Sequence, residues 1–575
     1  MDDPDKVFTF ENWPCKGEAG ASRYGKTQTS LRYLPPGQAV RPFLLQDWGW
    51  RAYVNHCEDV QERGLNANCN TPVPFFFTNF KLHLGSYGDS ANYTNKFTPQ
   101  KLPDGLSTER LIADYLRQLS RFALEEVRTR FGSFIQKRDI KWCLTVPSVW
   151  THSAKRTMRE CSEMGGLVSG PQCRDEDASL EKNFAIALEP EAASVYCLQK
   201  FKDSHELKMG SKVLVVDAGG GTVDLVVHEL IDDSGLRLRE VSTSTGDLCG
   251  GTFVDTAFMD YLAGKIPCFE QFRAEEPTTM LDILGKWEGI KYSFDQGQKR
   301  HFLPLPWKLG DAWETYIVDH EPWNGARQQV DQVVITREDM KAIFDGQVNK
   351  ILKLIGDQLV RVPEMKAIFV VGGFSNSPYL MDRIHANFSH YVNSMILSPV
   401  DSESAVSRGA TIIGTLGVDI MMSRKSRKTY GVAMHRLFHK GDPPRSNVIG
   451  ENGEALCKDA FDVFIRIGDD VPVNHCVREQ YFPLSRKEPD IKFTMYATSD
   501  PYPEYVTDKG VEKVDSWTYR LPPEALKMQR DPSVQVAMYF GRTHIQVAAQ
   551  PMNFRGGEKS MFSVLFDREL VEDVL

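Results

Sequence analysis

The most informative stretch of the sequence is Val213-Leu-Val-Val-Asp217-Ala-Gly-Gly-Gly-Thr222-Val-Asp224-Leu-Val-Val227. Its two apolar runs flank three glycines, which predicts two buried strands joined by a tight turn. Asp217 ends the first strand, and Thr222 and Asp224 begin the second. This combination of groups suits a phosphate and its Mg²⁺ ion. Converging glycine amides and a hydroxyl can donate to phosphate oxygens, and the two carboxylates can hold the ion or its waters. The alternative is a glycine-rich hairpin whose acidic turn residues bind no ligand.

Two more glycine turns follow the same pattern. Gly246-Asp-Leu-Cys-Gly250-Gly251-Thr252 precedes a predicted helix over 253–263, and a helix N-terminus is suited to an anion. Ile368-Phe-Val-Val-Gly372-Gly373-Phe-Ser375-Asn-Ser377-Pro378 ends another strand, and its last two residues predict an N-cap and a first helical residue. Three such units in one chain are hard to attribute to chance.

Strands and helices alternate around these turns. Apolar residues recur at helical spacing over 106–130 and 336–360, and Thr336 with Asp339 predicts a capping box. Residues 141–146 and 368–371 are typical of buried strands. The sequence therefore predicts an α/β architecture up to about residue 420.

From residue 423 the pattern changes to short segments in which apolar and polar residues alternate. These segments predict a β-rich C-terminal domain of about 145 residues. They span 462–467, 491–497, 517–521, 535–540 and 561–566. The basic run Ser423-Arg-Lys-Ser-Arg-Lys428 in front of them is interpreted as a solvated linker.

The composition is that of a globular protein. Of 575 residues, 41% are apolar and 25% are charged, which excludes a disordered, collagen-like or coiled-coil chain. The net charge of −9 argues against a nucleic-acid partner. The acidic N-terminus has no apolar signal segment, no run approaches about 18 apolar residues, and the 11 cysteines include no CxxC pair. We therefore expect a cytoplasmic protein with free thiols and no membrane segment.

These features resemble the actin-like ATPases and, among them, the 70-kDa heat-shock chaperones. The matching segments follow the family's order along the chain. They are Phe80–Gly85, Leu144–Pro147, Leu188–Ala193, Asp217–Asp224, Lys286–Lys291, Gly372–Leu380 and Pro399–Ala410. The resemblance implies a two-lobed, ribonuclease H-like α/β ATPase fold with a β-rich C-terminal domain. The implied boundaries are 1–208 for the first lobe, 209–422 for the second lobe and 429–575 for the β-rich domain.

The resemblance also implies an ATP site between the lobes. Asp217 and Glu189 would order the waters of Mg²⁺, Lys81 would lie near the γ-phosphate and the attacking water, and Thr222 and Asp224 would contact the phosphates and the metal shell. Glu288 and Lys291, three apart on one helix face, would contact the ribose and base. The remaining implied ATP or ADP contacts are Gly219, Gly220, Gly221, Gly250, Gly251, Gly372, Gly373 and Ser375.

The sequence departs from the family pattern at both ends. The first phosphate motif, an Asp-x-Gly-Thr-Thr hairpin, is absent, and Val7–Pro14 resembles the segment that comes after that hairpin in the family. We therefore expect that the natural start lies about 15–25 residues upstream, or that the first lobe is compromised. The acidic, leucine-rich interdomain linker is also missing, and the C-terminal domain is short for a peptide-binding domain with a lid. This pattern resembles the divergent type-12 branch.

A second phosphate-binding pattern, Gly20-Ala-Ser-Arg-Tyr-Gly25-Lys26-Thr27, satisfies the P-loop formula. A P-loop needs a buried strand before it and a helix after it. Here Glu11–Glu18 precedes the pattern, and Thr29–Pro36 is too short and ends in proline. No P-loop is therefore predicted.

Three functions remain open from the sequence. The first is an ATP-binding, chaperone-like stress-response protein with slow Mg²⁺-dependent hydrolysis, whose partners are adenine nucleotide, client polypeptides and co-chaperones. The second is a pseudo-ATPase that senses nucleotide or serves as a scaffold. The third is a small-molecule kinase on the same fold, which would need an aspartate base in the first lobe that the sequence does not reveal.

Overall fold

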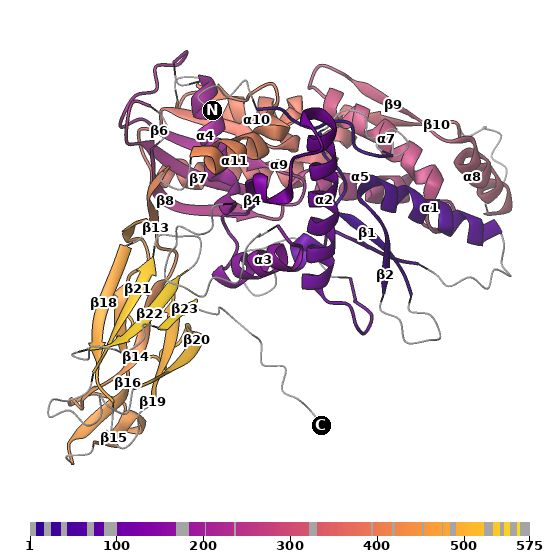
Figure 1. Ribbon diagram of the computed structural model, residues 1–575. Coiled ribbons are helices and arrows are strands. Elements are labelled where there is room, and N and C mark those ends of the chain that lie inside the picture. The colour runs from indigo at the N-terminus through magenta and orange to yellow at the C-terminus, as the bar shows by residue number, and fades with distance from the viewer. Residues whose placement is uncertain are drawn as a thin grey trace.

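The structure is a computed structural model of the chain (Figure 1). It describes residues 7–15, 25–35, 43–65, 74–84, 100–167, 183–201, 203–234, 237–320, 330–392, 395–416, 420–450, 453–473, 475–483, 490–521, 533–540, 545–552 and 560–563. None of the helices in these ranges has the length and apolar character needed to cross a membrane.

A seven-stranded sheet forms the centre of the second lobe. Its strand order is β12-β11-β6-β7-β8-β13-β17. The bounds are β6 (Lys212–Ala218), β7 (Val223–Leu230), β8 (Leu238–Asp247), β11 (Ala367–Val371), β12 (Ile396–Leu397), β13 (Met421–Lys425) and β17 (Asp470–Pro472). The predicted hairpin is confirmed, because β6 pairs antiparallel with β7. Strand β11 pairs parallel with β6, so the Gly372 turn and the Gly219 turn leave the same edge of the sheet.

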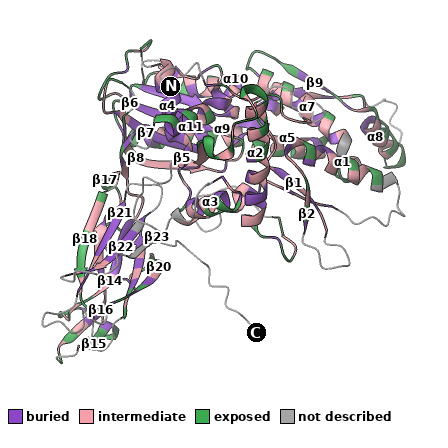
Figure 2. Cartoon of the chain, in the orientation of Figure 1, coloured by how far each residue is buried: buried purple, intermediate pink, exposed green. Residues whose placement is uncertain are grey.

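Helices cover both faces of this sheet because successive strand residues point to opposite sides. Leu214 and Val216 pack with α5 (Gly251–Lys265) and α9 (Arg337–Arg361) in one core, whereas Val213 and Val215 pack with α4 (Glu189–Phe201) and α11 (Ala405–Leu416) in another. The second-lobe elements are α5 (Gly251–Lys265), α6 (Phe269–Glu275), α7 (Pro277–Ser293), β9 (Arg300–Pro304), α8 (Trp307–His320), β10 (Gln332–Thr336), α9 (Arg337–Arg361) and α10 (Pro378–Phe388). In Figure 2 the buried residues follow the central strands.

The first lobe contains two small sheets and four helices among the described residues. One sheet has the order β2-β1-β3, and β4 pairs parallel with β5. The bounds are β1 (Ser30–Leu34), β2 (Leu44–Trp48), α1 (Gly49–Leu65), β3 (Phe75–Thr78), η2 (Phe80–Leu84), α2 (Thr108–Phe131), η3 (Lys137–Asp139), β4 (Trp142–Val146), α3 (His152–Met164), β5 (Phe184–Leu188) and α4 (Glu189–Phe201). Helix α1 packs against α7 of the second lobe, as Figure 1 shows.

Helices α4 and α11 (Ala405–Leu416) cross where the two lobes meet. Gly409 lies so close to the backbone of Ala192 that a Cβ atom would overlap the Ala192 carbonyl. The N-terminal segment joins this crossing, because Arg408 donates to the Val7 carbonyl (2.9 Å) and to the Thr9 hydroxyl (3.1 Å). The predicted helices over 106–130 and 336–360 and the Thr336 capping box are confirmed by α2 and α9.

The C-terminal part is the expected β-rich domain and extends away from the two lobes (Figure 1). Two sheets, of order β15-β16-β14-β19-β20 and β18-β21-β22-β23, share one hydrophobic core. The elements are β14 (Thr429–Leu437), η7 (Pro444–Ser446), β15 (Asn447–Ile449), β16 (Ala455–Ile465), β18 (His475–Tyr481), β19 (Asp490–Thr498), β20 (Val511–Arg520), β21 (Val534–Phe540), β22 (Gln546–Pro551) and β23 (Ser560–Ser563).

The interpretation of Ser423–Lys428 as a solvated linker is wrong. Residues up to Lys425 belong to β13, which pairs with β8 and β17 inside the seven-stranded sheet. Arg424 forms a two-pronged ion pair with Glu191 of α4, at 2.6 and 3.0 Å. Arg424 of this run therefore pairs with a charged group far away in the sequence.

Candidate nucleotide site

Asp217 and Asp224 face each other across the β6–β7 hairpin. They are paired residues of antiparallel strands, so their side chains lie on the same face of the sheet, and both are buried. Burial and the negative charges of Glu189 and Asp224 raise the pKa of Asp217 to about 7. Burial and Glu189 likewise raise the pKa of Asp224 to about 6. The hairpin therefore concentrates negative charge that an added cation would neutralise.

Lys81 and Glu189 meet beside this hairpin. The Lys81 ammonium, on η2, lies 2.6 Å from a carboxylate oxygen of Glu189, the first residue of α4. Lys81 also lies near enough to Asp217 to lower its pKa, against the larger effect of burial. The Trp150 ring lies 5.6 Å from the ammonium. The structure thus brings together all three residues for which the sequence predicts a catalytic role.

The glycine turn after β6 folds over the start of α5. The amides of Gly250, Gly251 and Thr252 donate to the carbonyls of this turn at 3.2, 3.0 and 2.9 Å. A Cβ atom on Gly250 would lie 2.6 Å from the Gly219 carbonyl oxygen, so the contact requires glycine. Within the described part of the chain, the amides of Gly220 and Gly221 donate to no carbonyl. Those two amides are therefore the ones left for a phosphate, whereas the α5 amides hold the turn.

The third glycine turn approaches Asp217 from β11. Gly372 has φ +90°, and a Cβ atom on it would lie 2.7 Å from an Asp217 carboxylate oxygen. The Ser375 hydroxyl lies 2.8 Å from both the Gly372 carbonyl and the Ser402 hydroxyl, so it fixes the turn. Gly373 has open space around the position of a Cβ atom.

Two predicted site residues lie on α7. The Lys291 ammonium is buried and donates to the Gly251 carbonyl (2.9 Å) and to Asp255 (2.8 Å). It also lies 6.0 Å from the Phe374 ring, which follows Gly373. Lys291 therefore ties α7 to the two glycine turns, and Glu288 lies one turn earlier on the same helix, partly buried.

The site contains further residues that the sequence did not predict. The Ser148 hydroxyl donates to an Asp224 carboxylate oxygen (3.1 Å), as does the Val149 amide (3.4 Å), and the Thr222 side chain also hydrogen-bonds to Asp224. Lys26, from the rejected P-loop pattern, is exposed and lies near enough to Asp217 to lower its pKa. Residues 25–29 lead into the strand β1, so the pattern lacks the helix of a P-loop, and residues 20–24 lie outside the described ranges.

The donor set fits a hydrated Mg²⁺ ion. Among the described residues, no three His, Cys, Asp or Glu side chains converge closely enough to ligate a metal directly. Asp217 and Asp224 are nevertheless buried, and their repulsion with Glu189 favours their protonated forms. Mg²⁺ keeps several of its waters in protein sites, so carboxylates can hold it through those waters.

Known proteins of one family are similar to this chain over much of its length. The family model described as Hsp70 protein matches residues 110–419, more than half of the chain. Human heat shock 70 kDa proteins 12A and 12B are each 26% identical over 95% of this chain and 86% of their own lengths. The chaperone protein DnaK of Nitrosopumilus maritimus is 23% identical over 55% of this chain and 45% of its own length. The chain therefore belongs to the Hsp70 family, in the divergent branch of the 12A and 12B proteins, and has that family's actin-like ATPase fold.

Proposed function

We propose that this protein binds Mg·ATP or Mg·ADP at the β6–β7 hairpin and hydrolyses ATP slowly, with a conformational change between its lobes. The observation that carries the proposal is the convergence of Lys81 and Glu189 on Asp217 from different elements. In phosphoryl transfer the protein forms no covalent bond with the substrate, and catalysis depends on positioning the reactants and stabilising the charge on the phosphate oxygens. A buried carboxylate beside a held lysine meets that need.

Each residue's role is proposed from its place in the site. Asp217, Glu189 and Asp224 would hold Mg²⁺ through its waters, and the ion would supply positive charge for the phosphate oxygens. The amides of Gly220 and Gly221 and the hydroxyl of Thr222 would contact phosphate. Lys81 would orient the water that attacks, and Glu189 positions Lys81.

The adenosine half of the nucleotide would lie along the other glycine turns. Gly372, Gly373 and Ser375 shape one side, and Glu288 and Lys291 contribute from α7. Lys291 and Ser375 would position the residues around the nucleotide, because their polar atoms already form hydrogen bonds with protein groups. Gly250 and Gly251 likewise support the site by holding the Gly219 turn.

A pseudo-ATPase is the second candidate. One observation favours it: the Lys81 ammonium already donates to Glu189, which leaves fewer of its three N–H donors for an attacking water. A kinase has less support, because the sequence reveals no aspartate base in the first lobe.

A chaperone-like role is the broader proposal. Its support is the family membership, the two-lobed fold and the β-rich domain at residues 429–575. Client polypeptides and co-chaperones would be the protein partners, and the cytoplasm would be the location. A boundary between the lobes at residue 208 would allow them to move about the α4–α11 crossing.

Two measurements on the full chain test the proposal. A thermal-shift assay should show stabilisation by Mg·ADP of roughly 2.7 kcal/mol at about 100 times its dissociation constant, and a smaller effect of Mg·GDP. Equal or absent shifts for both nucleotides would contradict an adenine site. Turnover of Mg·ATP then separates the two candidates, since a pseudo-ATPase shows the shift without phosphate release. Added sugars should not accelerate ATP consumption.

A further inference from the structure

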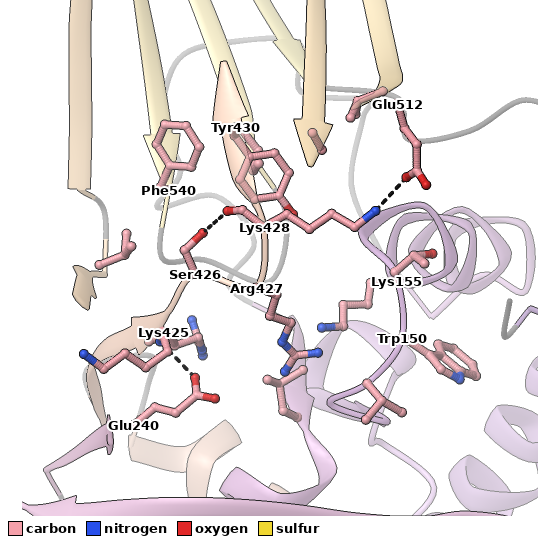
Figure 3. A pocket seen from close by; sticks show the side chains of 18 of the residues that line it. Trp150, Lys155, Glu240, Lys425, Ser426, Arg427, Lys428, Tyr430, Glu512 and Phe540 are labelled. Atoms are coloured by element: carbon pink, nitrogen blue, oxygen red, sulfur yellow. Dashed lines mark hydrogen bonds and ion pairs between the residues drawn. The ribbon is translucent and has the colours of Figure 1, made fainter. Parts of the chain in front are cut away.

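A cavity of about 220 Å³ lies between the lobes and the C-terminal domain (Figure 3). One wall comes from the segment after β4, from α3 and from β8, and the other comes from strands of the C-terminal domain. The run 424–428 crosses between them. This cavity adjoins the candidate nucleotide site, because it is lined by Val149, whose amide donates to Asp224, and by Trp150, which lies beside Lys81.

Lys155 on α3 is an unusual lining residue. It is 6% exposed, and its ammonium donates to the Ser148 carbonyl at 3.2 Å. No carboxylate of the described residues forms an ion pair with it. Burial lowers its pKa well below the usual range, and Arg427 and Arg424 add to that effect, whereas Glu191 and Glu240 oppose it. Burial beside two guanidinium groups makes the charged form of Lys155 costly, and a further anion at this position would favour that form.

Arg427 adds a second cation at the same point. Its guanidinium donates to the same Ser148 carbonyl and to the Ser244 hydroxyl, neither of which is charged. Figure 3 shows the head groups of Lys155 and Arg427 meeting at the cavity. Six lysines and arginines but only two glutamates line the cavity.

Two of the other lining cations are paired with carboxylates. Lys428 is paired with Glu512 at 2.6 Å, and Arg424 is paired with Glu191. The Glu240 carboxylate accepts from the amides of Ser244 and Lys425, both at 3.1 Å. Lys155, Lys425, Arg427 and Lys513 also line the cavity, and Glu240 acts electrostatically on both Lys155 and Arg427, so positive charge remains in excess.

The opposite wall is apolar. Tyr430, Val514, Phe540 and Ile545 line it, and each is less than 10% exposed. In Figure 3 the rings of Tyr430 and Phe540 lie on the strand side, across from the cationic head groups. A cavity of about 150 Å³ can hold benzene, so this one has room for a ring or a short chain with an anionic head.

We infer that this cavity binds a small amphipathic anion, with a carboxylate or phosphate head between Lys155 and Arg427 and an apolar body against Tyr430 and Phe540. The site does not depend on the proposed nucleotide function. The charged form of Lys155 is costly to bury beside Arg427 and Arg424, and an anionic head group would offset part of that cost.

Isothermal titration calorimetry of the full chain at pH 7.5 tests the inference with three probes of one shape. They are 2-naphthoate, 2-naphthyl phosphate and neutral 2-naphthol, each titrated with and without saturating Mg·ADP. At least one anion should bind with one-to-one stoichiometry, unaffected by Mg·ADP, and at least about tenfold more tightly than naphthol. The tighter of the two anions identifies the head group.

Variants decide whether the proposed residues make the site. Lys155→Met should weaken anion binding at least about tenfold and leave naphthol binding unchanged, whereas Lys155→Arg should retain it. Arg427→Gln, which keeps Lys155, should weaken binding in the same way. Lys353→Met, at an exposed position on α9, is the matched control and should change nothing.

Several results would overturn the inference. They are the absence of binding by both anions, equal binding of naphthol, or undiminished binding by both Lys155→Met and Arg427→Gln. Thermal melts show whether the variants are folded. Lys155→Met removes a desolvated charge, so its melting temperature should be no lower than that of the wild type. Competition by Mg·ADP would instead assign the anions to the nucleotide site and would also overturn the inference.

Discussion

The ammonium of Lys81 lies 2.6 Å from a carboxylate oxygen of Glu189, a residue 108 positions later in the chain. The pair joins η2 to the first turn of α4, beside the buried carboxylate of Asp217. The Lys81 side chain is 39% exposed, and ion pairs with such exposure contribute little to stability. The pair is therefore better explained by its position at the site than by a contribution to folding.

Lys81→Met should reduce Mg·ATP turnover by about 10²–10³-fold, because it removes one pre-organised charge at the site. The melting temperature should stay close to that of the wild type. Lys308→Met is the matched control, since Lys308 pairs with Glu276 at 2.8 Å with a similarly exposed side chain, away from the site. Steady-state phosphate release measures both variants. Equal losses in both, or a loss in neither, would contradict the role of Lys81.

Asp217→Asn should stabilise the metal-free protein at pH 8. The folded-state pKa of Asp217 is raised from 3.8 to about 7, so between these pH values the folded chain holds more protons than the unfolded chain. The contribution of Asp217 to stability therefore falls as the pH rises from about 4 to about 7. Asparagine does not titrate, so the gain in free energy of unfolding of the variant over the wild type should be greater at pH 8 than at pH 5.

Denaturant unfolding with a metal chelator at both pH values measures this effect. Asp311→Asn, at an exposed position on α8, is the control and should show no pH-dependent gain. Mg·ATP turnover of Asp217→Asn should fall by about 10²–10³-fold even though the fold is more stable. A variant that is less stable than the wild type at pH 8, or that retains turnover within about threefold, would contradict the assignment.

Elements encoded by local signals were predictable from the sequence. The capping box of α9 needs only Thr336 and Asp339, three positions apart, and the N-cap of α10 needs only Ser377 and its neighbours. The β6–β7 hairpin arises in the same way from two apolar runs around glycine. In each case the physical cause lies within a few residues of its effect.

The errors concern partners that are distant in sequence. The basic run has the local pattern of a solvated linker because its partners are remote: Glu191 lies 233 positions before Arg424. The position of Lys26 near Asp217 was not predicted for the same reason, since no residue close to Lys26 in the sequence points to Asp217 as its neighbour. The hydrogen bonds of Ser375 and Lys291 to protein groups likewise emerge only from the packed fold, and their contact with a ligand stays a prediction.

Arg424→Gln should lower the free energy of unfolding by about 3–5 kcal/mol, because it leaves the Glu191 carboxylate buried without its partner. The two side chains are 17% and 5% exposed. Burial alone would raise the pKa of Glu191, but Arg424 overrides it and lowers the pKa. The stabilisation should therefore be present above the ordinary pKa of 4.5 and should be lost as the pH falls through the folded-state value.

Guanidinium unfolding at pH 7 and at lower pH measures this contribution. Arg520→Gln is the matched control, because Arg520 forms a two-pronged pair with Asp490, but with a side chain that is 75% exposed. That variant should leave stability nearly unchanged. If the two substitutions changed the free energy of unfolding equally, burial of the Arg424–Glu191 pair would not affect stability.

Gly409→Ala should destabilise the protein and reduce turnover together. A Cβ atom would overlap the Ala192 carbonyl and lie 3.0 Å from the Ala192 Cα atom, so α11 and α4 must move apart. Overpacking of this kind costs about 1–3 kcal/mol or more. Because Glu189 begins α4, the same displacement should draw it away from Lys81 and slow Mg·ATP hydrolysis.

The matched control is Gly346→Ala in the interior of α9, where a Cβ atom would meet nothing within 4 Å. Alanine there should stabilise the protein by about 0.5–1 kcal/mol, since it lowers the conformational entropy of the unfolded chain and favours the helix. Thermal or denaturant unfolding and phosphate release distinguish the two variants. If Gly409→Ala matched Gly346→Ala in both measurements, α4 and α11 could separate without cost, and the crossing could not fix the position of Glu189. If Gly409→Ala were destabilised but fully active below its melting temperature, the close approach would serve the fold alone.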